Sequence, residues 1–157
     1  MKIQPGYLYH IKDEFFYIVD DKTLMQNHER GKQRPTYFTI RDNGILWFIP
    51  LSSKVDKYQK IIDKKITRYG FCNTILIREI MGVDHAILLQ NAFPTLEEYI
   101  DHVHKVNEIP AKVIDKLKNE ITRDFKKLLK LKEKNINVFY TDIDKIMRKL
   151  EELKLKT

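Results

Sequence analysis

The segment from residue 35 to residue 50 constrains the fold more than any other part of the chain. Two runs rich in aromatic and branched residues flank Asp42-Asn43-Gly44. Asn-Gly supplies the two positive-φ residues that a tight hairpin turn needs, so the segment predicts two antiparallel strands. Proline cannot donate a backbone hydrogen bond, and Pro50 therefore predicts the end of the second strand.

A candidate anion site follows this hairpin directly. Periodicity from Val55 onward predicts a helix, and Ser52, Ser53 and Lys54 stand at its start. Hydroxyls, a cation and free backbone N–H groups at a helix N-terminus form a phosphate site. Simple capping is the alternative, because Ser53-Lys-Val-Asp56 is close to a capping box.

The remaining patterns predict one α+β domain over residues 1–157, with about five strands and a helical C-terminal half. Alternation and turn residues predict strands over residues 6–11, 74–80 and 85–91. Caps and periodicity predict helices over residues 13–20, 55–69, 95–100, 110–133 and 141–154. His102 and His104 are placed on a helix as well, where side chains two residues apart point in different directions.

The net charge of +7 is unevenly distributed. Residues 1–104 hold 14 Lys and Arg against 13 Asp and Glu, whereas residues 105–157 hold 15 against 9. Such an excess favours a polyanion through counterion release, although Lys-rich helices also serve solubility alone. The lone Cys72, an N-terminus without a signal-like apolar run and the short apolar stretches predict a cytoplasmic protein that does not enter a membrane.

Residues around the hairpin could cleave RNA without a metal. The reaction needs a base for the 2′-hydroxyl proton, donors for the charge on the phosphorane and an acid for the 5′-oxygen. His10 or His28 could transfer the protons. The groups that could hold the phosphate are Lys32, Arg34, Ser52, Ser53 and Lys54. Each residue also has an ordinary explanation, as a strand-end charge, a buried histidine or a helix cap, and only their gathering around one hairpin favours a site.

Further basic side chains are expected to contact RNA. They lie in the loop before the hairpin, on one face of the helix after it and on the long C-terminal helix: His28, Arg30, Lys57, Lys60, Lys64, Lys116, Arg123, Lys126 and Lys127. No spacing of His, Cys and Asp resembles a metal site, and no Gly-rich phosphate loop occurs. Neither a metal nor a cofactor is therefore expected.

Four segments, in order, are similar to a known family. They are YHIKDEFF (9–16), KQRPTYF (32–38), IPLSSKVDKY (49–58) and LLQNAFP (88–94). They resemble the toxins of type III toxin–antitoxin systems, the ToxN/AbiQ-like endoribonucleases, and most of all the branch called CptN or TenpN. By position, the family's Pro-Leu-Ser/Thr-Ser step falls on residues 50–53, and its functional basic residue falls on Arg34, with Lys32 second.

The resemblance implies a Kid/MazF-like antiparallel barrel or sheet core of about five to six strands with added helices. It implies a metal-independent, sequence-preferring endoribonuclease that cuts single-stranded RNA and leaves a 2′,3′-cyclic phosphate. It also implies a partner, a pseudoknot RNA antitoxin cut from tandem repeats, in a protein–RNA hetero-oligomer that acts in abortive infection against phage. No DNA partner is implied.

Two other functions remain open. A non-catalytic RNA-binding module needs only the basic and aromatic side chains. An interaction protein would use its C-terminal helices to bind a protein partner.

Overall fold

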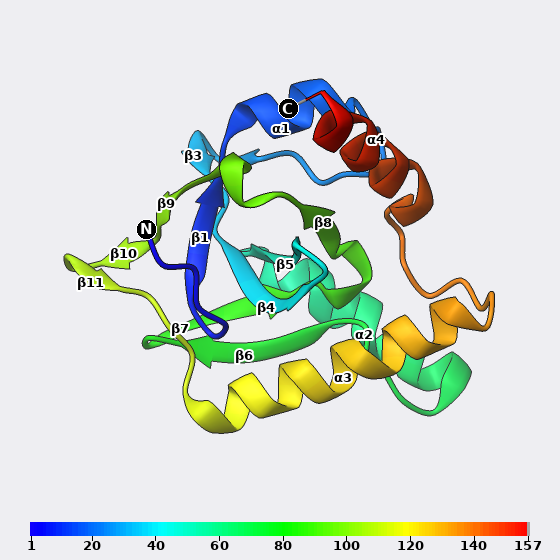
Figure 1. The fold of residues 1–157 in the computed structure, drawn as a ribbon. Coiled ribbons are helices and arrows are strands. Elements are labelled where there is room, and N and C mark those ends of the chain that lie inside the picture. Colours follow the sequence, from blue (N-terminus) through cyan, green and yellow to red (C-terminus); the bar gives the residue numbers. More distant parts are fainter. Residues whose placement is uncertain (157) are drawn as a thin grey trace.

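The structure is a computed structural model that describes residues 1–156. Its centre is an antiparallel sheet with the strand order β6-β7-β5-β4-β1-β9, in which β8 also pairs with β5 (Figure 1). The strands of this sheet are β1 (Leu8–Ile11), β4 (Thr36–Asp42), β5 (Ile45–Ser52), β6 (Leu76–Ile80), β7 (Val83–Ile87), β8 (Phe93–Thr95) and β9 (Ile100–Val103).

Two small hairpins and the helices complete the fold. The hairpins are β2 (His28–Glu29) with β3 (Lys32–Gln33), and β10 (Lys105–Val106) with β11 (Ile109–Pro110). The helices are α1 (Asp13–Val19), α2 (Val55–Tyr69), α3 (Asp115–Glu133) and α4 (Ile143–Leu155), with 3₁₀ turns at Leu89–Asn91 and Glu97–Tyr99.

The predicted α+β class is confirmed, with an antiparallel sheet and helices around it. Within residues 1–156 the strand order is open, because β6 and β9 end it without pairing with each other. The closed barrel that the resemblance implies is therefore not confirmed.

The predicted hairpin forms between β4 and β5. Asn43 and Gly44 have φ angles of 50° and 78°, and Asp42 pairs with Ile45 across the turn. The predicted strand end at Pro50 is wrong, because β5 continues to Ser52. The carbonyl of Pro50 accepts a hydrogen bond from the N–H of Leu88, so a proline that cannot donate still fits within the strand.

Strand β5 is buried along its whole length. One edge pairs with β4, while the other pairs with β8 over Leu46–Phe48 and with β7 over Leu51–Ser52. A strand covered on both faces has no need of alternating polar residues, which explains the unbroken apolar run before Ser52. Phe48 and Phe93 stack in the core beside it.

Two predicted helices differ from the structure. Residues 95–100 contain the end of β8 and a 3₁₀ turn, because Thr95 pairs with Leu46 in the sheet and does not cap a helix. The long helix begins at Asp115, since Pro110 belongs to β11. Thr95 is held by a distant strand, whereas Pro110 pairs with Lys105 in a local hairpin; in both places strand pairing overrides the helix signal.

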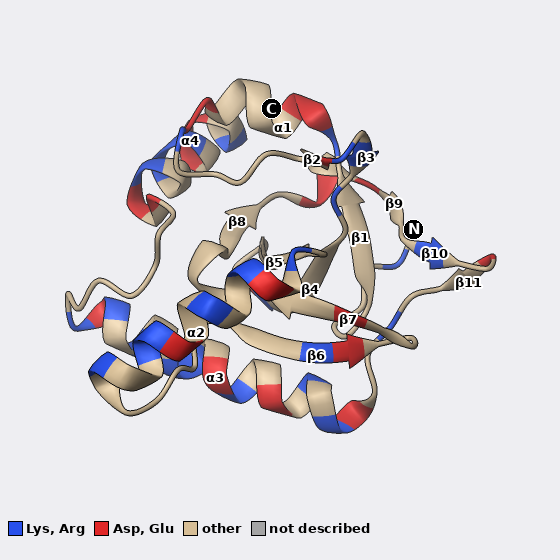
Figure 2. Cartoon of the chain, turned by 180° about the vertical axis from the view of Figure 1, so that it is seen from behind, with Lys and Arg blue, Asp and Glu red and all other residues tan. Residues whose placement is uncertain are grey.

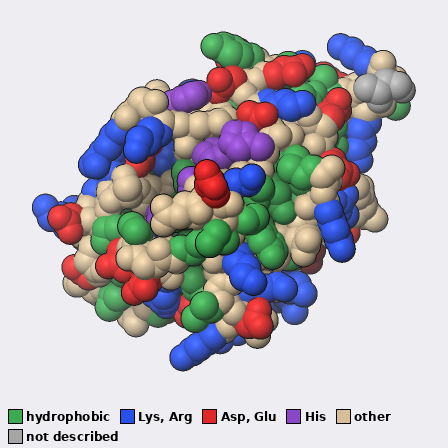
Figure 3. Space-filling model, turned by 90° about the vertical axis from the view of Figure 1, so that its left-hand side faces the viewer, with side chains coloured by type: hydrophobic (Ala, Val, Ile, Leu, Met, Phe, Trp, Pro, Cys, Tyr) green, Lys and Arg blue, Asp and Glu red, His purple; other side chains and the backbone are tan. Residues whose placement is uncertain are grey.

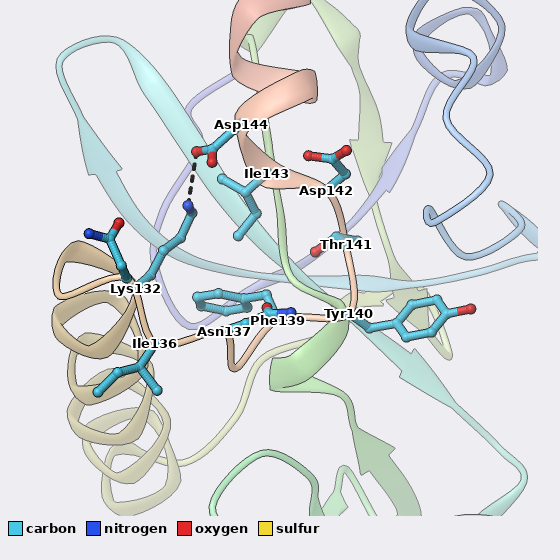
Figure 4. A pocket seen from close by; sticks show the side chains of 10 residues that line it. Lys132, Ile136, Asn137, Phe139, Tyr140, Thr141, Asp142, Ile143 and Asp144 are labelled. Carbon is cyan, nitrogen blue, oxygen red and sulfur yellow. Dashed lines mark hydrogen bonds and ion pairs between the residues drawn. The ribbon is translucent and has the colours of Figure 1, made fainter.

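The two long C-terminal helices lie on opposite sides of the sheet (Figure 1). The apolar face of α3, Leu117, Ile121, Phe125 and Leu128, is buried, and Phe125 packs against Trp47 of β5. Lys132 at the end of α3 forms an ion pair of 2.8 Å with Asp144 of α4 (Figure 4). This pair spans a small cavity lined by the loop between the two helices.

Most Lys and Arg residues lie in the helices, with Asp and Glu residues between them (Figure 2). Among residues 1–156, no helix has both the length and the apolar character needed to cross a bilayer.

Candidate active site

Strand pairing brings the ends of four strands together. The side of the sheet at which these strands end is called the edge below. Tyr9 of β1 pairs with Thr36 of β4, and Thr36 pairs with Pro50 of β5. Because these pairs are antiparallel, the residues after Tyr9, before Thr36 and after Pro50 all lie toward the same edge. This edge therefore holds His10, Arg34, Ser52 and Ser53, and Ser52 pairs in turn with Ala86 of β7.

Arg34 is buried, with 7% of its surface exposed. Its Nε donates to the carbonyl of Gln26 at 2.9 Å, and its Nη1 donates to the carbonyl of Leu51 at 2.8 Å. The same Nη1 forms an ion pair of 2.9 Å with Oε2 of Glu29. Backbone carbonyls thus fix the guanidinium in place, and Glu29 balances its charge.

Glu29 also binds both serines. Its Oε2 accepts a hydrogen bond from the Ser52 hydroxyl at 2.9 Å. Its Oε1 accepts one from the Ser53 hydroxyl at 2.7 Å and one from the Ser53 N–H at 3.1 Å. One carboxylate therefore gathers Arg34, Ser52 and Ser53 into a single cluster, here called the Glu29 cluster.

The protonation of Glu29 reflects these contacts. Burial by itself would raise the pKa of Glu29, but the hydrogen bonds from Ser53 and Ser52 and the charge of Arg34 outweigh burial and lower the pKa to about 2. Glu29 is consequently ionised at neutral pH.

The serines do not cap helix α2. Lys54 occupies the N-cap position, and no side-chain hydrogen bond caps the helix. The Ser52 hydroxyl accepts a hydrogen bond from the N–H of Lys54 at 3.1 Å while it donates to Glu29. The capping interpretation is therefore wrong, and both hydroxyls donate to the Glu29 carboxylate instead.

A second cluster, of histidines, lies at the same edge. Nε2 of His10 is 2.8 Å from Nδ1 of His104, and the rings of His10 and His102 stack with centroids 4.6 Å apart. His85 of β7 is close enough for its charge to affect His104. Figure 3 shows histidine side chains gathered on this face. His10, His85, His102 and His104 are here called the histidine cluster.

The inner histidines of this cluster favour the neutral form. Burial and the nearby His104 and His102 lower the pKa of His10 to about 4. Burial, His85 and His102 likewise lower the pKa of His104. A neutral imidazole can accept a proton, which is the property a general base needs near pH 7.

The prediction that His102 and His104 point apart on a helix is wrong. His102 lies in β9 and pairs with His10 of β1, and the register shifts between His10 and Ile11. In a strand, residues two apart lie on the same face, so both side chains reach His10. The His-x-His spacing carried this signal, but the strand and helix interpretations of the segment could not be separated locally.

The remaining predicted residues lie outside these clusters. Lys32 is exposed and faces Glu29 across the β2–β3 hairpin. His28 is exposed and bonds Asp13 at 2.8 Å, while Arg30 lies at the exposed hairpin tip. The basic residues on α2 and α3 are exposed: Lys57, Lys60, Lys64, Lys116, Arg123, Lys126 and Lys127. Sequence reasoning missed Glu29, because an acidic residue in a basic loop gives no sign of the serines it will bind.

Within the part of the chain that the structure describes, no group of three or more His, Cys, Asp or Glu side chains is arranged to hold a metal ion.

Comparison with known proteins gives a match among solved structures. No protein-family profile matches the chain, and no curated protein matches it. Among solved structures, AbiQ, a lactococcal anti-phage endoribonuclease belonging to the type III toxin–antitoxin system, superposes with a TM-score of 0.72. The match covers 98% of this chain and 100% of AbiQ at 14% sequence identity. The chain therefore has the fold of AbiQ, a structural neighbour from the group that its sequence segments resemble.

Proposed function

We propose that this protein is an endoribonuclease toxin that cleaves single-stranded RNA without a metal. The observation that carries the proposal is the hydrogen-bonded pair of His10 and His104 at the same sheet edge as Arg34 and the two serines. AbiQ, which has this fold, is an endoribonuclease. Proton-transfer groups beside phosphate-binding groups are the parts that RNA cleavage requires.

His104 is the better placed of the two imidazoles to contact RNA. His10 is 7% exposed, whereas His104 is only partly buried. When His104 donates from Nδ1 to Nε2 of His10, its own Nε2 is left as a proton acceptor. In that arrangement His104 takes the 2′-hydroxyl proton, and His10 orients the ring and shares the charge.

The reaction then follows from the chemistry of RNA. The deprotonated 2′-oxygen attacks phosphorus and the bond from phosphorus to the 5′-oxygen breaks. The 5′-oxygen takes a proton from water, and protonated His104 returns its proton to the hydroxide that is left. The products are a 2′,3′-cyclic phosphate and a 5′-hydroxyl. Arg34, Ser52, Ser53 and Lys54 stabilise the charge that develops on the phosphate oxygens.

A cleavage assay in EDTA tests the proposal. Wild-type protein is expected to cut a mixed single-stranded RNA and to leave cyclic phosphate ends. His104→Gln is expected to cut about 100-fold more slowly or worse, as is usual for the loss of a general base. His28→Gln tests the other proton-transfer candidate: loss of cleavage in that variant, but not in His104→Gln, would assign the role to His28. Absence of cleavage by wild-type protein would refute the proposed function.

The proposed partner is a small pseudoknot RNA antitoxin cut from tandem repeats, which inhibits the enzyme by direct binding in a protein–RNA assembly in the cytoplasm. AbiQ belongs to a toxin–antitoxin system of the same type. The exposed basic residues of α2 and α3 supply a surface that attracts RNA. Expression of the protein is expected to arrest growth, and co-expression of the repeat RNA encoded beside it is expected to restore growth.

One observation favours a second function, a non-catalytic RNA-binding module. The donors of Ser52, Ser53 and Arg34 that would hold a phosphate already bind Glu29. This module would bind RNA in a salt-sensitive manner, without cleavage and without toxicity.

A further inference from the structure

The Glu29 cluster is an anion site that already contains an anion. The carboxylate accepts four hydrogen bonds: from the Ser53 hydroxyl and N–H, from the Ser52 hydroxyl and from Arg34. These are the donors that the proposed function assigns to the scissile phosphate. Each hydroxyl has a single hydrogen to donate, so neither can bind a phosphate while it binds Glu29.

A carboxylate and a phosphodiester present similar chemistry to such donors. Each carries one negative charge spread over two outer oxygens, and guanidinium and hydroxyl groups bind both. With Glu29 in place, its charge offsets that of Arg34, so the cluster offers an incoming phosphate little attraction. With Glu29 removed, the guanidinium, two hydroxyls and a backbone N–H would all point at an unoccupied anion site.

The backbone around Glu29 is firmly held, so the side chain is the part that can move. Glu29 pairs with Lys32 in the β2–β3 hairpin. Asn27, just before this hairpin, and Gln33, in its second strand, each donate to the carbonyl of Ile11 at 2.8 Å. Rotation about the side-chain bonds of Glu29 would release the donors without breaking any of these contacts.

We propose that Glu29 is an internal stand-in for the scissile phosphate, which keeps the site closed until bound RNA displaces it. The proposal rests on the proposed function and adds a regulatory contact to it. The opposite role, in which Glu29 stays in place to orient the serines and Arg34, makes a different prediction, because removal of its charge would then leave RNA affinity unchanged or reduce it.

Binding of an uncleavable RNA separates the two roles. The probe is a single-stranded RNA with 2′-O-methyl groups throughout, which lacks the attacking hydroxyl. Glu29→Gln is expected to bind this RNA about five- to tenfold more tightly than wild-type protein, since a buried like charge is removed.

Glu97→Gln is the matched control. Glu97 also pairs with an arginine, Arg41, at 3.4 Å, and Arg41 lies at the opposite end of β4 from the site. The control makes the same change in net charge and is expected to change affinity less than twofold. A Glu29→Gln protein that binds no more tightly than Glu97→Gln would overturn the proposal.

A measurement on wild-type protein covers the case in which Glu29→Gln fails to fold. The ¹³C signal of the Glu29 side-chain carboxyl is expected to shift when the 2′-O-methyl RNA binds, because the carboxylate exchanges serine and arginine donors for water. An unchanged signal at saturating RNA would overturn the proposal. Neither experiment depends on cleavage, so a wild-type protein that binds RNA without cutting it refutes the proposed function and still tests the role of Glu29.

Discussion

Replacement of Glu29 by glutamine is expected to lower the free energy of unfolding by an amount that depends on pH. The side chains of Glu29 and Arg34 are 13% and 8% exposed, so solvent screens their interaction little. The pKa of Glu29 is about 2, against an ordinary value of 4.5. Since each pH unit of difference corresponds to about 1.4 kcal/mol, the ionised carboxylate contributes about 3 kcal/mol at pH 7.

The direction of the pH dependence follows from the lowered pKa. A carboxylate whose pKa is lower in the folded protein stabilises it above the ordinary pKa, and this stabilisation is lost as the pH falls through the folded pKa. For Glu29 the loss runs from about pH 5 to about pH 2. At pH 3 only about half of the contribution is expected to remain.

Urea unfolding followed by circular dichroism measures this effect. Wild-type protein, Glu29→Gln and Glu97→Gln are compared at pH 7 and at pH 3, because other carboxylates titrate in the same range and cancel in the comparison. The difference between wild type and Glu29→Gln is expected to shrink by about half at pH 3. The same difference at both pH values would refute the reasoning that the Ser53, Ser52 and Arg34 contacts stabilise the charged form.

Two further predictions concern the core and the basic helix. Phe125 is fully buried against Trp47, so Phe125→Ala is expected to lower the free energy of unfolding by about 3–5 kcal/mol in urea titrations. Phe71→Ala is the control, because its side chain is 63% exposed. An equal loss of unfolding free energy in the two variants would contradict the packing of α3 on β5. Neutralisation of Lys116, Arg123, Lys126 and Lys127 on α3 is expected to weaken binding of the antitoxin RNA and to reduce the salt dependence of the affinity. If both the affinity and its salt dependence are unchanged, α3 does not contact RNA.

Local patterns were reliable wherever one turn or one helix face decided the outcome. Asn43-Gly44 supplied both positive φ angles of the hairpin turn, and α2 ends at Tyr69, where the helix over residues 55–69 was predicted to end. The apolar spacing of α3 identified its buried face. These features depend on residues within a few positions of one another, so the sequence contains the information needed to predict them.

Patterns failed where strand pairing competed with a local helix signal. Thr95 and Pro110 resembled helix starts, yet both lie in strands. His102 and His104 were placed on a helix, yet β9 brings both to His10. Thr95 and His102 pair with residues far along the chain, which no local propensity records. Pro110 pairs with Lys105 in a short hairpin that the helix signal concealed.

The sequence by itself determined the α+β class, the central hairpin and the serines and arginine that gather at its end. Only the tertiary structure decided what those groups bind. Glu29 reaches Ser52 and Ser53 from a hairpin more than twenty positions earlier in the chain, and the histidine cluster combines β1, β7 and β9 with the residue after β9. Such contacts depend on how the sheet orders its strands, and strand order is a property of the whole chain.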